Sequence, residues 1–187
     1  MAEVSFSYSD LFGAAFGYDP PAFEFTDVNN NQYTKLGSPN TAKDAFGRSY
    51  YLPVTLGGIS LPYPVVRIQG KKRIVETSLV NRTGTVKELI SMDDYEIDIR
   101  GLIISKDNFF PDQLIMQLRD LYRQQSSLKI SSGLTDIFLS QPEAQGSDYV
   151  VIREIEFPEV RGIMNVRPYS IKLTSDAPFD LVKKTNN

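Results

Sequence analysis

Residues 95–104 have the sequence YEIDIRGLII, which is the clearest strand pattern in the chain. Apolar and charged side chains alternate over its first half, and this period of two residues is typical of a β-strand with one buried face. The apolar side chains on one side are Tyr95, Ile97 and Ile99, and the charged side chains on the other are Glu96, Asp98 and Arg100. Beyond Gly101 the alternation gives way to an apolar run.

Further strand patterns lie on both sides of this stretch. Gly57-Gly58 separates two β-like segments, 50–56 and 59–68, because two glycines accommodate the positive φ of a hairpin turn. A second turn is expected near 69–73, and a third at Thr83-Gly84. Residues 133–140 are ambiguous between a strand and one helical turn. The later strands are expected at 127–131, 149–157 and 167–176.

One helix is predicted, over about residues 111–125. Pro111 suits the first helical position, and one apolar stripe follows it. The stripe consists of Leu114, Ile115, Leu118, Leu121 and Tyr122. Strands outnumber helices and their connections are mostly short, which favours antiparallel pairing. The sequence therefore predicts a mainly β (α+β) domain over 49–181, an antiparallel β-sandwich or barrel with this one flanking helix, followed by a polar tail, 182–187.

Residues 1–48 differ from the rest of the chain and are predicted to form an extended arm. They are rich in aromatic residues, Gly and Asn, and poor in aliphatic residues. A short helix can form at 9–17 with Ser9 as its N-cap. The arm either packs on its own domain or docks on a neighbouring subunit, and we favour docking. The arm residues expected at such an interface are Phe12, Phe16, Tyr18, Phe23 and Phe25.

The composition excludes several kinds of chemistry. The 187 residues include no Cys, His or Trp, so this chain alone cannot build a disulfide, a Cys/His zinc site or a Ser-His-Asp triad. Twenty Lys and Arg against 23 Asp and Glu give a net charge of −3, which does not suit a binder of duplex nucleic acid. Residues 27–31 begin like a calcium loop, but Gln32 replaces the required Gly. We expect no enzyme activity, no cofactor and no metal.

Two charged clusters remain as candidate interaction sites. Asp93, Asp94, Glu96 and Asp98 could line a solvated or subunit-facing strand, or serve as a carboxylate acid/base pair. Lys71, Lys72 and Arg73 form either a patch for an acidic partner or a charged hairpin tip that protects an edge strand. The acidic strand of one copy could pair with the basic hairpin of the next, closing a head-to-tail ring. The expected interface residues are Lys71, Lys72, Arg73, Asp94, Glu96 and Asp98.

Three segments together carry a resemblance to a known family. They are RTGTVKELISMDDYEIDIRGLI (82–103), FPDQLIMQLRDLYRQQSSLKISSGLTDIFL (110–139) and VVIREIEFPEVRGIMNVRPYSIKLTSDAPFDL (150–181). This part of the chain, roughly 60–181, resembles uncharacterised proteins encoded among phage and prophage tail genes. It also looks like baseplate and tail-tube-related proteins of phages and phage-derived injection systems.

The resemblance implies a structural subunit of a virion tail or phage-like particle, made in the host cytoplasm, with no membrane insertion. It implies a ring, with six copies expected, at the end of the tail tube or in the baseplate, as hub, distal-tail or tube-capping protein. A long hairpin would reach the next subunit, and neighbouring tail proteins would be partners. DNA would only pass through, so the lumen could be lined by 94–98 or by Glu154 and Glu156.

Two other functions remain open from the sequence. The chain could be a monomeric connector or assembly factor that binds another tail protein. It could also be a tail hydrolase, such as a cell-wall glycosidase, that uses two of the four clustered carboxylates.

Overall fold

The computed structural model describes residues 8–18, 39, 41–43, 47, 49–81, 83–105, 109–139, 148–159 and 164–176. Helices α1 (Tyr8–Phe16), α2 (Asp112–Arg123) and α3 (Gly133–Leu139) lie within them. The first strands are β1 (Thr41–Lys43), β2 (Ser49–Tyr51), β3 (Val54–Leu56), β4 (Ile59–Leu61) and β5 (Val65–Gln69). The others are β6 (Lys72–Ser78), β7 (Thr85–Met92), β8 (Glu96–Ile104), β9 (Leu128–Ser131), β10 (Tyr149–Glu156) and β11 (Val166–Ser175).

The fold is mainly β with antiparallel pairing, which confirms the predicted fold class. Seven strands form one sheet in the order β4-β3-β9-β10-β11-β8-β5. Its two edge strands are consecutive in sequence and are joined only by residues 62–64. The four Cα–Cα steps from Leu61 to Val65 span at most about 15 Å, so the sheet must coil until its edges come near each other. The sheet is therefore barrel-like.

The strand from which the prediction began is the second strand from one edge of this sheet. It pairs with β11 over nine residues and with β5 over five. Ile97 and Ile99 are buried in the core, whereas Glu96 is exposed on the opposite face. Tyr169 and Ile171 of β11 join the same core. The predicted alternation is confirmed.

Helix α2 covers the core, as predicted, and ends within two residues of its expected bounds. Leu118 and Leu121 are buried, and Leu114 and Ile115 pack partly against the core. Tyr122 is 49% exposed, so its assignment to the buried stripe was wrong. The stripe is narrower than predicted: successive residues of an α-helix are about 100° apart, so Tyr122 lies at the margin of the face centred on Leu118 and Leu121. Leu121 lies over the Gly57 turn, where an added Cβ would be 2.7 Å from the Leu121 Cδ2 atom.

Two further helices accompany α2, namely α1, which the sequence allowed at 9–17, and α3. The ambiguous segment 133–139 is a helix that begins directly after Ser132. The Ser132 hydroxyl accepts a hydrogen bond from the Leu134 amide at 3.3 Å, as an N-cap side chain does. Asp136 reaches back to the Ser132 amide at 3.3 Å. Burial raises the pKa of the Asp136 carboxyl above its ordinary value.

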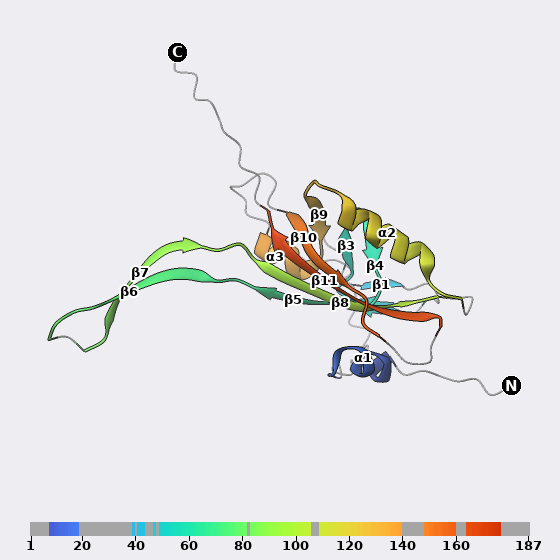
Figure 1. Ribbon diagram of the computed structural model, residues 1–187, viewed down its shortest axis with the longest axis horizontal. Coiled ribbons are helices and arrows are strands. Elements are labelled where there is room, and N and C mark those ends of the chain that lie inside the picture. Colours follow the sequence, from blue (N-terminus) through green and yellow to red (C-terminus); the bar gives the residue numbers. More distant parts are fainter. Residues whose placement is uncertain are drawn as a thin grey trace, which may run out of the picture.

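Helix α1 packs on the outer face of the coiled sheet (Figure 1), one residue earlier than expected at each end. Phe12 is fully buried there with Leu11, Leu102 and Val166. This part of the arm packs on its own domain, the alternative that the sequence disfavoured. Phe23, Phe25 and the tail 182–187 lie outside the described residues.

A two-stranded hairpin, β6–β7, extends from one end of the body (Figure 1). It continues the direction of β5 and β8, and its loop contains the predicted Thr83-Gly84 turn, with Gly84 at φ 93°. Lys71, Lys72 and Arg73 lie at the base of this hairpin, so their placement at a hairpin tip was wrong. The sequence predicted a turn near 69–73, but in the structure β5 continues into β6 at these residues. In the part of the chain that the structure describes, no helix is long and apolar enough to cross a membrane.

Candidate assembly surface

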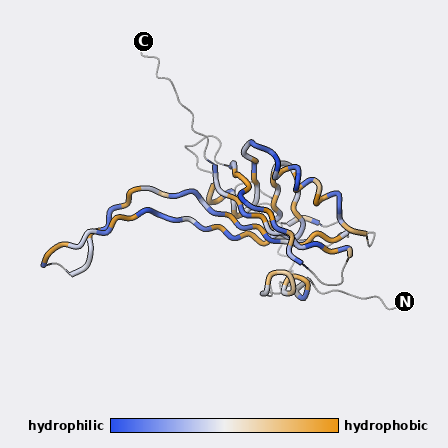
Figure 2. Tube along the Cα trace, viewed as in Figure 1, coloured by the Kyte–Doolittle hydropathy of each residue, from blue (hydrophilic) through white to orange (hydrophobic). Residues whose placement is uncertain are grey.

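The β6–β7 hairpin exposes apolar side chains on both of its faces. Ile74 and Leu89 are cross-strand partners, so they share one face, and they are 48% and 58% exposed. Val75 points to the other face and is also about half exposed. In β6 and β7 only Val86 is even partly buried. Figure 2 shows apolar segments along the hairpin and at its tip.

A β-bulge lies near the base of the hairpin. Arg73 pairs with Ser91 and Ile74 pairs with Leu89, so Ile90 is the extra residue on β7. Bulges bend the strand that contains them and increase its twist. The exposed Ile90 and Met92 therefore widen the apolar surface where the hairpin leaves the body.

The predicted basic and acidic clusters meet at the base of the hairpin, within one subunit. The Lys71 Nζ lies 3.0 Å from a Glu96 carboxylate oxygen, and the Arg73 Nε lies 2.8 Å from an Asp93 oxygen. Both pairs are substantially exposed, so each contributes little to stability. For the expected head-to-tail pairing between copies, these ion pairs within one subunit would have to break and form again between subunits. Asp94 lies in the link between β7 and β8.

The outer face of the sheet carries a row of alternating charges. Arg67, Asp98, Lys172 and Glu154 are in register across β5, β8, β11 and β10. The Lys172 Nζ lies 2.7 Å from a Glu154 oxygen, and this hydrogen bond raises the pKa of Lys172 above its ordinary value. The carboxylates predicted to make an acidic face thus lie among cations, and the face is close to charge-balanced at this row.

The Glu154→Gln substitution is expected to lower the pKa of Lys172 toward its ordinary value, because Glu154 is the main cause of the shift. The Lys172–Glu154 pair stabilises the fold at pH values below the ordinary lysine pKa. Its contribution to the free energy of unfolding is lost as the pH rises through the raised pKa of Lys172. Lysine side-chain NMR across an alkaline titration measures this. Glu156→Gln is the matched control: Glu156 is a minor cause, so a larger effect from it would contradict the assignment.

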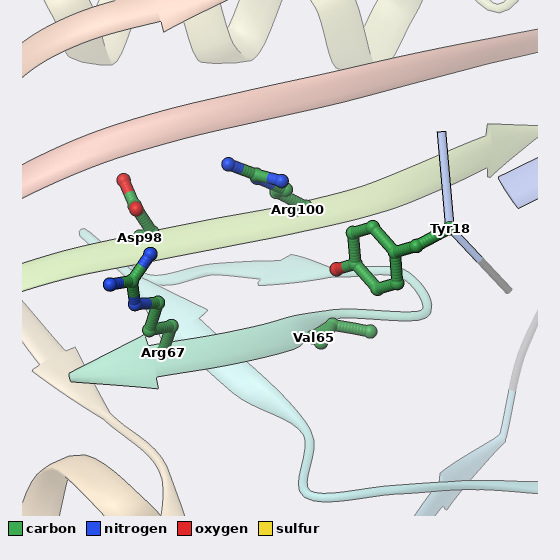
Figure 3. A pocket seen from close by; sticks show the side chains of 5 residues that line it. All are labelled: Tyr18, Val65, Arg67, Asp98 and Arg100. Atoms are coloured by element: carbon green, nitrogen blue, oxygen red, sulfur yellow. The ribbon is translucent and has the colours of Figure 1, made fainter. Parts of the chain in front are cut away.

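A small hollow of about 180 Å³ lies where α1 meets this row of charges (Figure 3). It is lined by Tyr18, Val65, Arg67, Asp98 and Arg100. The Arg100 guanidinium lies 5.7 Å from the centre of the Phe16 ring. The rings of Phe16 and Tyr18 both contact the Phe12 ring, in a tilted and an edge-on arrangement. Phe12, Phe16 and Tyr18, three of the aromatic residues predicted for an interface, therefore form one cluster on their own subunit. A single carboxylate lines this hollow.

A larger hollow of about 570 Å³ lies at the other end of the body, beside the start of α2. We call it the end hollow. Its apolar wall is formed by Tyr50, Tyr63, Ile103, Ile104, Phe109 and Leu114. Asp112, Gln113 and Gln117 supply polar groups on the side of the helix. Phe109 is 72% exposed, so this wall is an open apolar surface.

These two apolar surfaces are not marked by any pattern in the sequence. Ile74, Val75, Leu89 and Ile90 look like ordinary core positions of a strand pair, and only their place beyond the ends of β5 and β8 leaves them uncovered. The end hollow is assembled from five separate stretches of the chain, so no local motif marks it. Among the described residues, no group of three or more Asp or Glu could hold a metal ion.

The fold and these surfaces define a coiled antiparallel β-domain with a projecting hairpin that exposes apolar side chains between charged ones. The chain belongs to the family described as a domain of unknown function, DUF6046, whose model matches residues 60–186. No curated protein matches the chain.

Three of the solved structures that match part of the chain come from phage and gene transfer agent particles. The chain is similar to the SPP1 Dit protein, titled a paradigm of the hub adsorption apparatus in phages that infect Gram-positive bacteria, with 12% identity and a TM-score of 0.44. That match covers 69% of this chain and 51% of Dit, so the chain spans about half the length of that protein. A tail protein of an empty gene transfer agent particle with C6 symmetry matches with 13% identity over 64% of this chain and 81% of that one, with a TM-score of 0.38. A protein of the native gene transfer agent virion matches with 13% identity over 73% and 96%, with a TM-score of 0.42.

Proposed function

We propose that the chain is a structural subunit of the tail of a phage or phage-like particle, and that it assembles through its β6–β7 hairpin. The observation that carries this proposal is the exposure of apolar side chains on both faces of the hairpin. The sequence resemblance to proteins encoded among tail genes supplies the class of particle. The structural likenesses are too distant to add to this support.

An isolated hairpin of this kind is poorly stable in water, because two strands bury too little apolar surface. Its open edges also present unpaired backbone groups that other strands can pair with. Contact with neighbouring subunits on both faces would remove Ile74, Leu89 and Val75 from water together. One hairpin per subunit that contacts a different surface on the next subunit is a heterologous contact, which closes into a ring when the rotation allows it.

The finer proposal is a ring of six copies at the end of the tail tube or in the baseplate, as hub, distal-tail or tube-capping protein. The row Arg67–Asp98–Lys172–Glu154 supports a face past which DNA can travel as cargo, because alternating charges do not present a basic wall to phosphates. Adjacent tube or baseplate proteins would be the other partners, and the tail of the particle would be the location.

A hydrolase is not favoured by the geometry of the described residues. A glycosidase needs two carboxyl groups about 5–9.5 Å apart across a cleft. Asp98 is the one carboxylate among the described residues that line the small hollow, and Asp112 is the one that lines the end hollow. Asp93 and Glu96 form exposed ion pairs instead. The structural role therefore remains our proposal.

The proposal is tested by the mass of the purified protein in solution, measured by light scattering over a range of concentrations. We expect an oligomer for the natural sequence and a monomer for the Ile74→Asp/Leu89→Asp variant, because two carboxylates on one hairpin face cannot be desolvated in the contact. Ile137→Asp is the matched control, since Ile137 is 64% exposed on α3 and belongs to neither strand of the hairpin. A natural protein that stays monomeric at every concentration would contradict the ring and favour the connector function.

A further inference from the structure

The small hollow beside α1 contains more hydrogen-bond donors than acceptors, and it carries a net positive charge. Two guanidinium groups, those of Arg67 and Arg100, and the phenol of Tyr18 line it together with one carboxylate, that of Asp98. In the described part of the chain, neither arginine is close enough to a carboxylate to form an ion pair. Arg67 reaches the Gln69 side-chain oxygen at a long 3.5 Å. Most of these donors are therefore available to a ligand.

The register of β5 and β8 places the two arginines where one small anion can contact both. Arg67 lies opposite Asp98, and Val65 lies opposite Arg100. Positions two apart on a strand share a face, so all four side chains belong to the outer face of the sheet. Arg67 and Arg100 are diagonal neighbours on that face, and such neighbours lie about 7–8 Å apart. A group with two oxygen atoms can accept from both guanidinium groups across this distance.

Helix α1 holds two of the donors in position. Gly17 has φ 75° and ends the helix in a left-handed turn, after which Tyr18 contacts the Phe12 ring edge-on, with centroids 5.4 Å apart. The Arg100 guanidinium lies over the Phe16 ring of the same helix. Figure 3 shows the Tyr18 hydroxyl pointing toward the side on which the charged groups lie. Side chains that are already held in place lose less conformational freedom when a ligand binds.

We propose that this hollow binds one carboxylate, the end of an Asp or Glu side chain that belongs to another protein chain. Two guanidinium groups against Asp98 leave a single positive charge, which one carboxylate neutralises. The neighbouring Lys172 is already paired with Glu154 and does not alter this balance. A phosphate group with nearly two negative charges would exceed it. Guanidinium forks also match the two oxygens of a carboxylate.

The size of the hollow favours a side chain over a free small molecule. Its volume of about 180 Å³ is below the range of about 300–1,000 Å³ that is typical of pockets for small-molecule ligands. The end of an acidic side chain fits such a space while the rest of its protein stays outside. The hollow lies on β5 and β8 and not on the hairpin strands, so this contact is additional to the one made by the hairpin.

Titration of the full-length protein with N-acetylglutamate N-methylamide, observed by NMR at pH 7, tests the proposal. The one charge of this probe is its side-chain carboxylate. We expect the arginine Nε–H signals of Arg67 and Arg100 to shift, with a dissociation constant in the millimolar range, and to shift less at high salt. Arg67→Gln should weaken binding about tenfold. Arg119→Gln is the matched control and should leave binding unchanged, because Arg119 already pairs with Asp120 at 2.8 Å.

Changing the charge of the hollow tests the reason for its selectivity. Asp98→Asn should tighten binding of the carboxylate probe and should also allow N-acetylphosphoserine N-methylamide to bind, because a second positive charge is then uncompensated. If the natural protein binds the phosphoserine probe more tightly than the carboxylate probe, the proposal is wrong. It is also wrong if Arg67→Gln has no effect on binding of the carboxylate probe.

Two further variants identify what occupies the hollow. Asp19 follows Tyr18 directly but lies outside the described residues. If the Asp19→Asn protein binds the probe and the natural protein does not, the chain fills the hollow with its own carboxylate and the proposal falls. The titration is repeated on the Ile74→Asp/Leu89→Asp protein, in which the hairpin contact is removed. Absence of binding in both the natural protein and this variant overturns the carboxylate site, whereas the proposed function is decided separately by light scattering.

Discussion

Replacing Gly101 by alanine is expected to destabilise the fold by about 3 kcal/mol, at the upper end of what overpacking a core costs. Gly101 is the cross-strand partner of Tyr169, which is fully buried. A Cβ atom at Gly101 would overlap the Tyr169 hydroxyl and would lie 2.8 Å from the Pro62 carbonyl oxygen. The Tyr169 hydroxyl donates a 2.8 Å hydrogen bond to that same carbonyl. The methyl group must therefore displace a buried ring and break the hydrogen bond that holds the link between β4 and β5.

Denaturant unfolding measures the loss of stability caused by Gly101→Ala. The same substitution is also made in the Tyr169→Phe protein, and the two costs are compared. The single Tyr169→Phe change removes one hydrogen bond and is expected to cost about 1 kcal/mol. In the double variant Gly101→Ala/Tyr169→Phe the atom closest to the new methyl group is absent, so the combined cost should be smaller than the sum of the two. Additive costs would contradict the close contact, because residues in contact are expected to couple.

Leu118→Ala is expected to destabilise the fold by about 3 kcal/mol, because it leaves a cavity under α2. Leu118 is fully buried between the helix and the sheet. For a chain of this size the midpoint of thermal unfolding should fall by about 6–12 °C. Tyr122→Ala is the control on the same helix, and it should change the stability by less than about 0.5 kcal/mol because its side chain is half exposed. Thermal unfolding of the two variants checks the contrast.

Large losses of stability for both Leu118→Ala and Tyr122→Ala would show that the helix buries the full stripe predicted from the sequence. The comparison therefore distinguishes the predicted buried face, which includes Tyr122, from the face in the structure, which leaves Tyr122 half exposed.

Where side-chain periodicity is local, the sequence was sufficient to predict the structure. The alternation from Tyr95 to Arg100 and the glycines at 57–58 predicted a strand and a hairpin that the structure confirms. The helix at 133–139 was ambiguous because its start depends on one capping serine, Ser132, and its apolar residues are too few to show a period. Phe12 was assigned to a neighbouring subunit because its partners, Leu102 and Val166, are about 90 and 150 residues away along the chain.

The candidate surfaces were harder to predict than the fold. The charged residues Lys71 and Glu96 were identified, but a sequence does not show whether opposite charges 25 residues apart pair within a subunit or between subunits. The apolar hairpin residues have the β-propensity of core residues, and their exposure follows only from the length by which β6 and β7 extend past the sheet. The residues of the end hollow come together only after the sheet has coiled.

The continuity of the hairpin with β5 and β8 has a mechanical consequence. A pull on the tip is carried by the chain into both strands and is directed along their length. The hydrogen bonds of an antiparallel pair lie across the strands, so such a load shears the whole ladder at once instead of opening it one bond at a time. Nine cross-strand pairs connect β8 to β11, the longest ladder in the sheet. A hairpin anchored in this way can bear tension while the domain behind it keeps its shape.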